Sequence, residues 1–110
     1  MIEKIVLDYL DSVLDVPVYM EMPEDDLDSF VIIEKTGSDK VDHIPSATFA
    51  FQSYGKTMLQ AAQLNEAVKE AVENLITLDA IGRARLNSDY NYTDTAMKRY
   101  RYQAVYVITY

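Results

Sequence analysis

Apolar residues recur every three or four positions at the start of the chain and again in its middle. In the first segment they are Ile2, Ile5, Val6, Tyr9, Leu10, Val13 and Leu14. In the second they are Leu64, Ala67, Val68, Ala71, Val72 and Leu75. Both spacings are typical of amphipathic helices. Thr57 and Gln60 have the spacing of a capping box, so the second helix should begin there.

Three strands are predicted between these helices. Residues 16–22 are strand-like and bounded by proline, which favours a short edge strand. The apolar, β-branched run 30–33 favours a central strand that ends at Gly37. Residues 36–45 are polar, and we expect either a mobile loop or a hairpin arm there. Residues 47–54 alternate in polarity, which predicts the third strand.

The last part of the chain contains two more strand-like runs. They flank a polar stretch and predict an antiparallel hairpin with its turn near Thr95 and Ala96. The opposed pairs would be Tyr92 and Tyr100, Tyr90 and Tyr102, Leu86 and Tyr106, and Ala84 and Ile108. This register places the tyrosines in one block. We expect residues 104–110 to lie in the sheet and residues 98–103 to project as an outer arm.

The element order is therefore α-β-β-β-α-β-β. It predicts an α+β fold in which two helices pack on one face of a mainly antiparallel sheet. The chain has 110 residues, which suits a single domain spanning 1–110. Its apolar runs are far shorter than the roughly 20 residues that span a bilayer. The N-terminal residues also lack the pattern of a signal peptide. We therefore expect a soluble protein made in the cytoplasm, with no membrane partner.

Charge and composition remove several functional classes. The net charge of −8 disfavours binding to nucleic acid, which requires clustered cations. The chain has no cysteine, so disulfides and thiolate chemistry are excluded. Its three glycines are too widely spaced to form a phosphate-binding loop. The composition gives no indication of a cofactor.

Few residues suggest catalysis or metal binding. His43 is the only histidine and lies in a polar segment, and nearby Ser46 lacks the motif that surrounds a hydrolase nucleophile. The carboxylates of residues 24–28 could attract a divalent cation, but they lack the glycine and distal glutamate of an EF-hand. A solvated turn is the simpler interpretation. We expect no catalytic residue, no metal ligand and no enzymatic activity.

The tyrosines near the end of the chain have two explanations. Tyrosine has high strand propensity, and it is also enriched at protein interfaces. For Tyr106 and Tyr110 we expect core packing. The predicted oligomer or partner interface consists of Tyr90, Tyr92, Arg99, Tyr100, Arg101 and Tyr102.

The assembled pattern resembles a known family. It combines a short N-terminal helix, a P-V-Y-like first strand, a strand of the type FVIIEKTG, the stretch ATFAFQSYGKTMLQAAQLNEAVKEAVENL, and a closing hairpin. In that stretch an aromatic alternating strand leads directly into an alanine-rich amphipathic helix. This is similar to the tail terminator and tail completion (head-tail joining) proteins of long-tailed bacteriophages and prophages, over almost the whole chain.

The resemblance implies a structural role in virion assembly. Such proteins form a ring, commonly a hexamer, that caps the tail tube, stops its polymerisation and offers a docking surface for the head. The expected partners are other copies of the chain, the tail tube protein, the head-tail connector proteins, and DNA that passes through without specific binding. The location would be the tail end or neck of the virion, after assembly in the host cytoplasm.

An acidic lumen suits such a ring, because repulsion from phosphate reduces adhesion to DNA. We expect Asp25, Asp26, Asp39 and Asp42 to face the lumen or the tube. The alternative function is a small cytoplasmic adaptor or regulator that binds one partner protein through the C-terminal hairpin. An enzyme is the third and weakest alternative.

Overall fold

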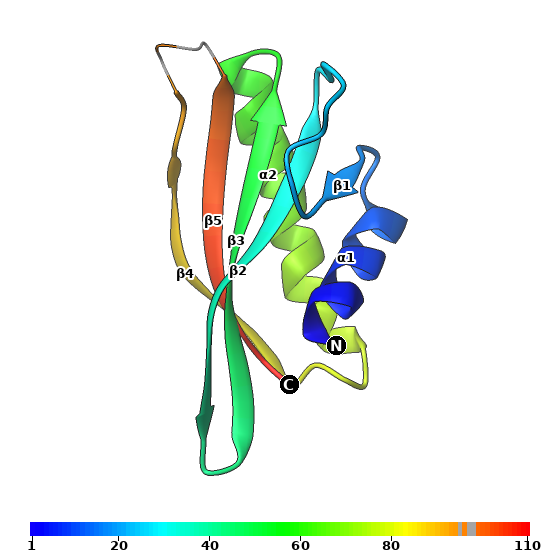
Figure 1. Cartoon of the computed structure of the whole chain (residues 1–110), viewed down its shortest axis with the longest axis vertical. Coiled ribbons are helices and arrows are strands. Elements are labelled where there is room, and N and C mark those ends of the chain that lie inside the picture. The colour runs from blue at the N-terminus through cyan, green and yellow to red at the C-terminus, as the bar shows by residue number, and fades with distance from the viewer. Residues whose placement is uncertain (95, 97–98) are drawn as a thin grey trace.

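The computed structural model describes residues 1–94, 96 and 99–110. The helices are α1 (Ile2–Val13) and α2 (Met58–Glu73), with the short 3-10 helix η1 (Asn74–Thr77) after α2. The strands are β1 (Val18–Tyr19), β2 (Phe30–Val41), β3 (Ile44–Gly55), β4 (Arg83–Asn91) and β5 (Tyr100–Thr109). This order confirms the predicted α+β class (Figure 1). None of the helices described is long and apolar enough to cross a membrane.

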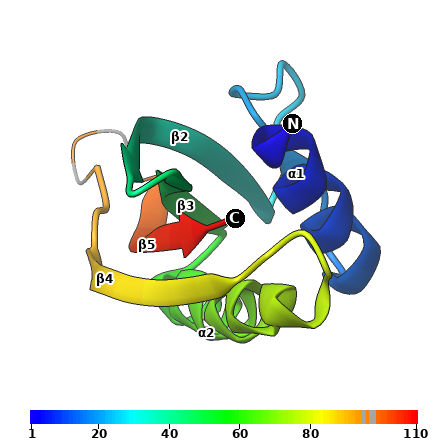
Figure 2. The ribbon, with the colours of Figure 1, turned by 90° about the horizontal axis from the view of Figure 1, so that it is seen from below.

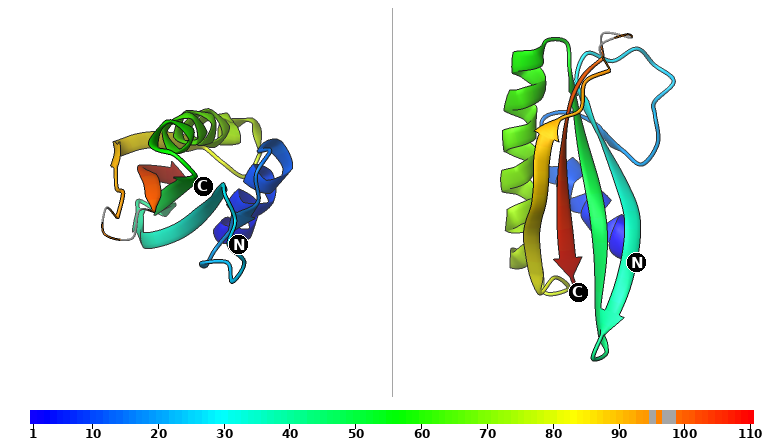
Figure 3. Two further views of the ribbon diagram at one scale, coloured as in Figure 1. Left: turned by 90° about the horizontal axis from the view of Figure 1, so that it is seen from above. Right: turned by 90° about the vertical axis from the view of Figure 1, so that its left-hand side faces the viewer.

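The five strands form one sheet in the order β1-β2-β3-β5-β4. β1 pairs with β2 in parallel, while the other three pairings described are antiparallel. Both helices pack on the same face, which we call the helix side, and the opposite face is the open side (Figures 2 and 3). The largest fully buried side chains of the helix side are Val6, Leu10, Val31, Ile33, Phe49, Phe51, Val68, Val72, Leu75, Tyr106 and Ile108.

An ion pair holds the first turn of α1 to the sheet. Lys35 Nζ on β2 lies 3.0 Å from Glu3 Oε2. The hydrogen bond from Lys35 lowers the pKa of the Glu3 carboxyl, so the carboxylate is favoured near neutral pH. An acidic residue in the first turn also suits the positive end of the helix dipole. The apolar stripe of α1 is thereby aligned over the core.

The start of α2 is fixed by a side-chain cap and a close backbone approach. Thr57 Oγ1 accepts a hydrogen bond from Gln60 N at 3.1 Å, which confirms the predicted helix start. Gly55, at the end of β3, lies directly against the first turn of the helix. A Cβ atom at Gly55 would lie 2.5 Å from Ala61 N, so only glycine fits there.

Residues 36–45 form a hairpin arm rather than a mobile loop. β2 does not end at Gly37 as predicted but continues to Val41, which pairs with Ile44 of β3. The turn residues Asp42 and His43 have φ of 51° and 66°, as in the type I′ turns that close two-residue hairpins. Figure 1 shows this arm projecting beyond the other strands. The sequence did not indicate the longer strand because the arm has no buried face.

The predicted register of the C-terminal hairpin is correct at one end and wrong at the other. Leu86 faces Tyr106 as predicted, but Tyr90 faces Gln103 instead of Tyr102. A β-bulge lies between Leu86 and Ser88, and it shifts every later pair by one residue. The predicted turn residue Thr95 lies outside the described residues.

The expected outer arm of the last strand is also wrong. Residues 100–103 pair with β3 across from Gly55–Gln52, so they lie inside the sheet. Lys98, at the start of that segment, lies outside the described part of the chain. Tyr106 is fully buried as predicted, whereas Tyr110 follows the end of β5 and is exposed. The projecting arm of this protein is therefore the β2–β3 hairpin.

Replacing Gly55 with alanine should destabilise the protein. The new methyl group would collide with backbone atoms of α2, and we expect a loss of about 1–3 kcal/mol in the free energy of unfolding. Gly37→Ala is the matched control, since a Cβ there has no atom within 4 Å. Urea unfolding followed by circular dichroism measures both. Equal effects of the two substitutions would contradict the close approach at Gly55.

Candidate functional site

A row of aromatic rings and arginine crosses the open side of the sheet. Phe30 of β2 stacks on Tyr54 of β3, with ring centroids 4.5 Å apart and planes at 12°. Tyr19 of β1 meets Phe30 edge-on at 6.4 Å. Such ring pairs add stability beyond the burial of their area. Together with Arg101 of β5 and Tyr92, which directly follows β4, these residues form the aromatic–arginine row across the sheet.

Arg101 links β3 to the end of β4. Its Nη1 donates to the Tyr54 hydroxyl and its Nε to the Tyr92 carbonyl, both at 2.8 Å. Its guanidinium carbon also lies 4.3 Å from the centre of the Tyr92 ring. Arg99 lies 5.9 Å from the centre of the Phe30 ring. These cation–π contacts mean that both predicted interface arginines already have partners within the chain.

The bulge divides the predicted block of tyrosines between the two sides. Tyr90 and Tyr92 lie on the open side, 41% and 46% exposed, and their rings meet edge-on at 5.8 Å. Tyr90 also receives a hydrogen bond from Gln103 Nε2. Tyr100 and Tyr102 are half-buried and, by strand alternation, share the side of Tyr106. Tyr90 and Tyr92 are thus the predicted interface tyrosines that are accessible on the open side.

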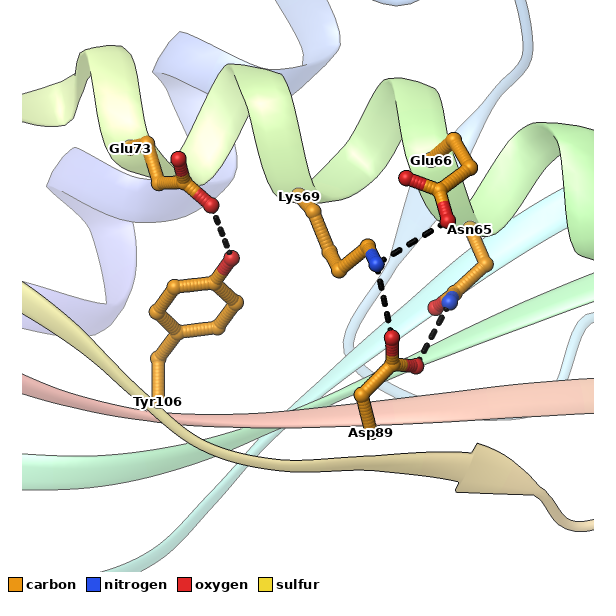
Figure 4. Close-up of polar contacts among 6 residues, drawn as sticks. All are labelled: Asn65, Glu66, Lys69, Glu73, Asp89 and Tyr106. Atoms are coloured by element: carbon orange, nitrogen blue, oxygen red, sulfur yellow. Dashed lines mark hydrogen bonds and ion pairs between the residues drawn. The ribbon is translucent and has the colours of Figure 1, made fainter.

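On the helix side, Asp89 joins β4 to α2 (Figure 4). Its Oδ2 lies 2.6 Å from Lys69 Nζ, and its Oδ1 accepts a hydrogen bond from Asn65 Nδ2 at 2.7 Å. Lys69 Nζ also lies 3.0 Å from Glu66 Oε1. The hydrogen bond to Asp89 is the main reason that the pKa of Lys69 is raised, and Glu66 adds to it. The ammonium group is therefore held in its charged form.

A second polar contact joins β5 to α2. The hydroxyl of buried Tyr106 donates to Glu73 Oε2 at 2.6 Å (Figure 4). Burial, and then the neighbouring Glu73 carboxylate, raise the pKa of the Tyr106 hydroxyl, which remains a neutral donor. The carboxylates and cations here are used to dock the helix. Glu66, Lys69 and Glu73 also line a shallow hollow between α2 and Leu86 of β4.

The four acidic residues predicted for the lumen lie at two ends of the molecule. Asp25 and Asp26 belong to the loop between β1 and β2, whereas Asp39 and Asp42 lie on the arm. Figure 1 shows these segments at opposite ends of the long axis, which measures 44 Å. A shared lumen would have to extend along that axis to include all four.

The other residues considered for catalysis or metal binding lie in different parts of the structure. His43 lies in the exposed turn of the arm, and Ser46 pairs with Asp39 on the arm's other strand. Asp26 and Asp28 line a shallow hollow opposite Lys56 and Arg99. Within the described ranges, no group of three or more histidine or carboxylate side chains could hold a metal ion.

Comparison with known proteins adds no family. The chain matches none of the protein-family models and none of the curated proteins against which it was compared.

Asp89→Asn should weaken the docking of α2 on the sheet. The substitution removes the charge that faces Lys69, which is largely buried, so we expect a loss of about 1–3 kcal/mol in the free energy of unfolding. Glu66→Gln is the matched control, because that side chain is 72% exposed and should contribute less than about 1 kcal/mol. Urea unfolding reports both values. A larger loss for Glu66→Gln would contradict the role given to Asp89.

Proposed function

We propose that this chain is a structural protein of bacteriophage assembly. It forms a ring at the end of the tail tube, stops polymerisation of the tube, and provides the surface that joins tail to head. Its partners are other copies of itself, the tube protein and the head-tail connector proteins. We propose a ring of six subunits. Its place is the tail end or neck of the virion. The support comes from the element order, from the resemblance described above, and from the shape of the arm.

The arm is the observation that carries this proposal. Every residue from 34 to 44 is exposed, and Val41 and Ile44 form an apolar pair at the tip, 60% and 56% exposed. A two-stranded hairpin with no core beneath it is marginally stable by itself. Such an element gains stability when it packs against another protein. We propose that the arm contacts the tube, with Asp39 and Asp42 towards the passing DNA.

One observation favours the alternative function. Tyr90 and Tyr92 are accessible on the open side, next to the exposed edge of β4. A cytoplasmic adaptor could use the same tyrosines to bind a single partner protein. The two functions differ in the size of the particle. A ring needs many copies, whereas an adaptor acts as a monomer or dimer.

The mass in solution tests the ring. Light scattering should give about 76 kDa for six chains of 12.6 kDa, or another multiple that corresponds to a closed ring. Added to the tail tube protein that it is proposed to cap, the protein should shorten the tubes seen by electron microscopy. A protein that stays monomeric and leaves tube length unchanged would contradict the proposed function.

Substitutions at the arm tip separate capping from ring formation. Val41→Thr with Ile44→Thr keeps β-branched residues but removes apolar area, so capping of tubes should weaken about tenfold while the ring mass stays the same. Ser38→Thr on the same arm is the control and should cap normally, because Ser38 is exposed but lies away from the apolar tip. Normal capping by the double variant would show that the tip does not contact the tube.

A further inference from the structure

We infer that the subunits of the ring join head to tail through the two edges of the sheet, which carry opposite charge. The partner of each edge is a second copy of this chain. This inference rests on the proposed ring and identifies the surfaces that build it.

One edge of the molecule carries the whole net charge. Residues 1–28 contain nine of the 18 carboxylates and one of the ten cations, which gives −8, the charge of the entire chain. This segment comprises α1, β1 and the loop that leads to β2, and β1 is the first strand of the sheet. All its carboxylates from Asp8 to Asp28 are exposed. We call residues 8–28, with these carboxylates, the acidic edge.

The opposite edge is basic. Residues 83–110 hold five cations and two carboxylates, and β4 is the last strand of the sheet. Arg83 and Arg85 are exposed, and their partners Thr109 and Val107 place them on the open side. Asp89, the carboxylate within β4, faces the helix side and is neutralised by Lys69. Arg83 and Arg85, together with Tyr90 and Tyr92, form the basic edge.

Both edges also expose side chains that suit a contact. Met20 and Met22 are exposed within the acidic edge, and Tyr90 and Tyr92 within the basic edge. Methionine sulfur and aromatic rings attract each other, and each residue buries apolar area at an interface. The two edges therefore complement one another in apolar character as well as in charge. Figures 1 and 2 both show them on opposite sides of the molecule.

The sign of the charge determines the symmetry of assembly. A two-fold dimer would place like edges together, and like charges across an interface are unfavourable. Opposite edges favour a head-to-tail contact, which closes into a ring when the rotation between subunits allows it. Acidic side chains of α2, among them Glu70, line a hollow with Leu86 of β4 and so flank that strand on the helix side. The contact should therefore use the open side of β4.

A reciprocal exchange of charge tests the inference. One variant carries Arg83→Glu and Arg85→Glu, and the other carries Asp11→Lys and Asp15→Lys. The lysines lie near the carboxyl end of α1, where cations suit the helix dipole. At an ionic strength of about 10 mM, where screening extends over about 30 Å, each variant alone should self-associate about 100-fold or more weakly than the wild type.

Mixing the two variants should restore assembly. The first presents acidic groups at both edges and the second presents basic groups at its β4 edge and around residues 11–15, so an equimolar mixture should form particles with alternating subunits. Native mass spectrometry should find them in a 1:1 ratio. Thr36→Glu with Ser38→Glu and Lys40→Glu is the matched control for the arginine variant, because it makes the same change in net charge on the exposed arm, away from the two edges, and should keep the wild-type mass. Circular dichroism checks that each variant is folded.

The outcomes separate this inference from the proposed function. If the wild type forms rings and the Arg83/Arg85 variant forms them equally well, the ring stands and the charged-edge contact is wrong. A mixture that does not assemble also overturns the contact. If the arginine variant assembles normally but loses binding to DNA, the basic edge serves nucleic acid instead. A wild type that never exceeds the monomer mass contradicts the ring itself.

Discussion

The β-bulge between Leu86 and Ser88 determines which side chains of β4 reach α2 and which face away from it. Beyond the bulge, Asp89 faces the helix side and binds Lys69, while Tyr90 faces the open side. Without the extra residue these two side chains would exchange sides, because neighbouring residues of a strand point in opposite directions. The docking of α2 and the exposure of the tyrosines therefore depend on the same local irregularity.

The same irregularity shows where sequence reasoning fails. The pattern of apolar residues predicted both helices and the order of the strands along the chain, because these depend on burial. The cap at Thr57 was predicted from the spacing of Thr57 and Gln60, because it depends on neighbouring residues. The bulge lies in the polar run around Asn87, where a shift of one residue leaves no trace in the hydrophobic pattern. The pairing of Asp89 with Lys69 joins residues 20 positions apart and follows from the bulge, so it could not be predicted either.

The arm and the arginines show a second limit. Residues 36–41 continue a strand without a buried face, so period-two alternation could not reveal them. Arg99 and Arg101 alternate with tyrosines in the sequence, which suggested an interface, but the structure uses both in contacts with Phe30, Tyr54 and Tyr92. An arginine that already contacts aromatic rings of its own chain holds those rings in position, and the rings can then contact a partner. The charge of such an arginine is less available for an ion pair with a partner protein.

The distribution of charge over the fold determines the symmetry proposed for the ring. The acidic N-terminal segment and the basic β4 lie at opposite ends of the strand order, so one subunit offers two different surfaces to its neighbours. The most direct test is an electron cryomicroscopy structure of the particle that forms at low ionic strength. We predict a closed ring with cyclic symmetry, in which β4 of each subunit faces residues 8–28 of the next. A two-fold dimer, or a ring whose subunits meet through other surfaces, would contradict it.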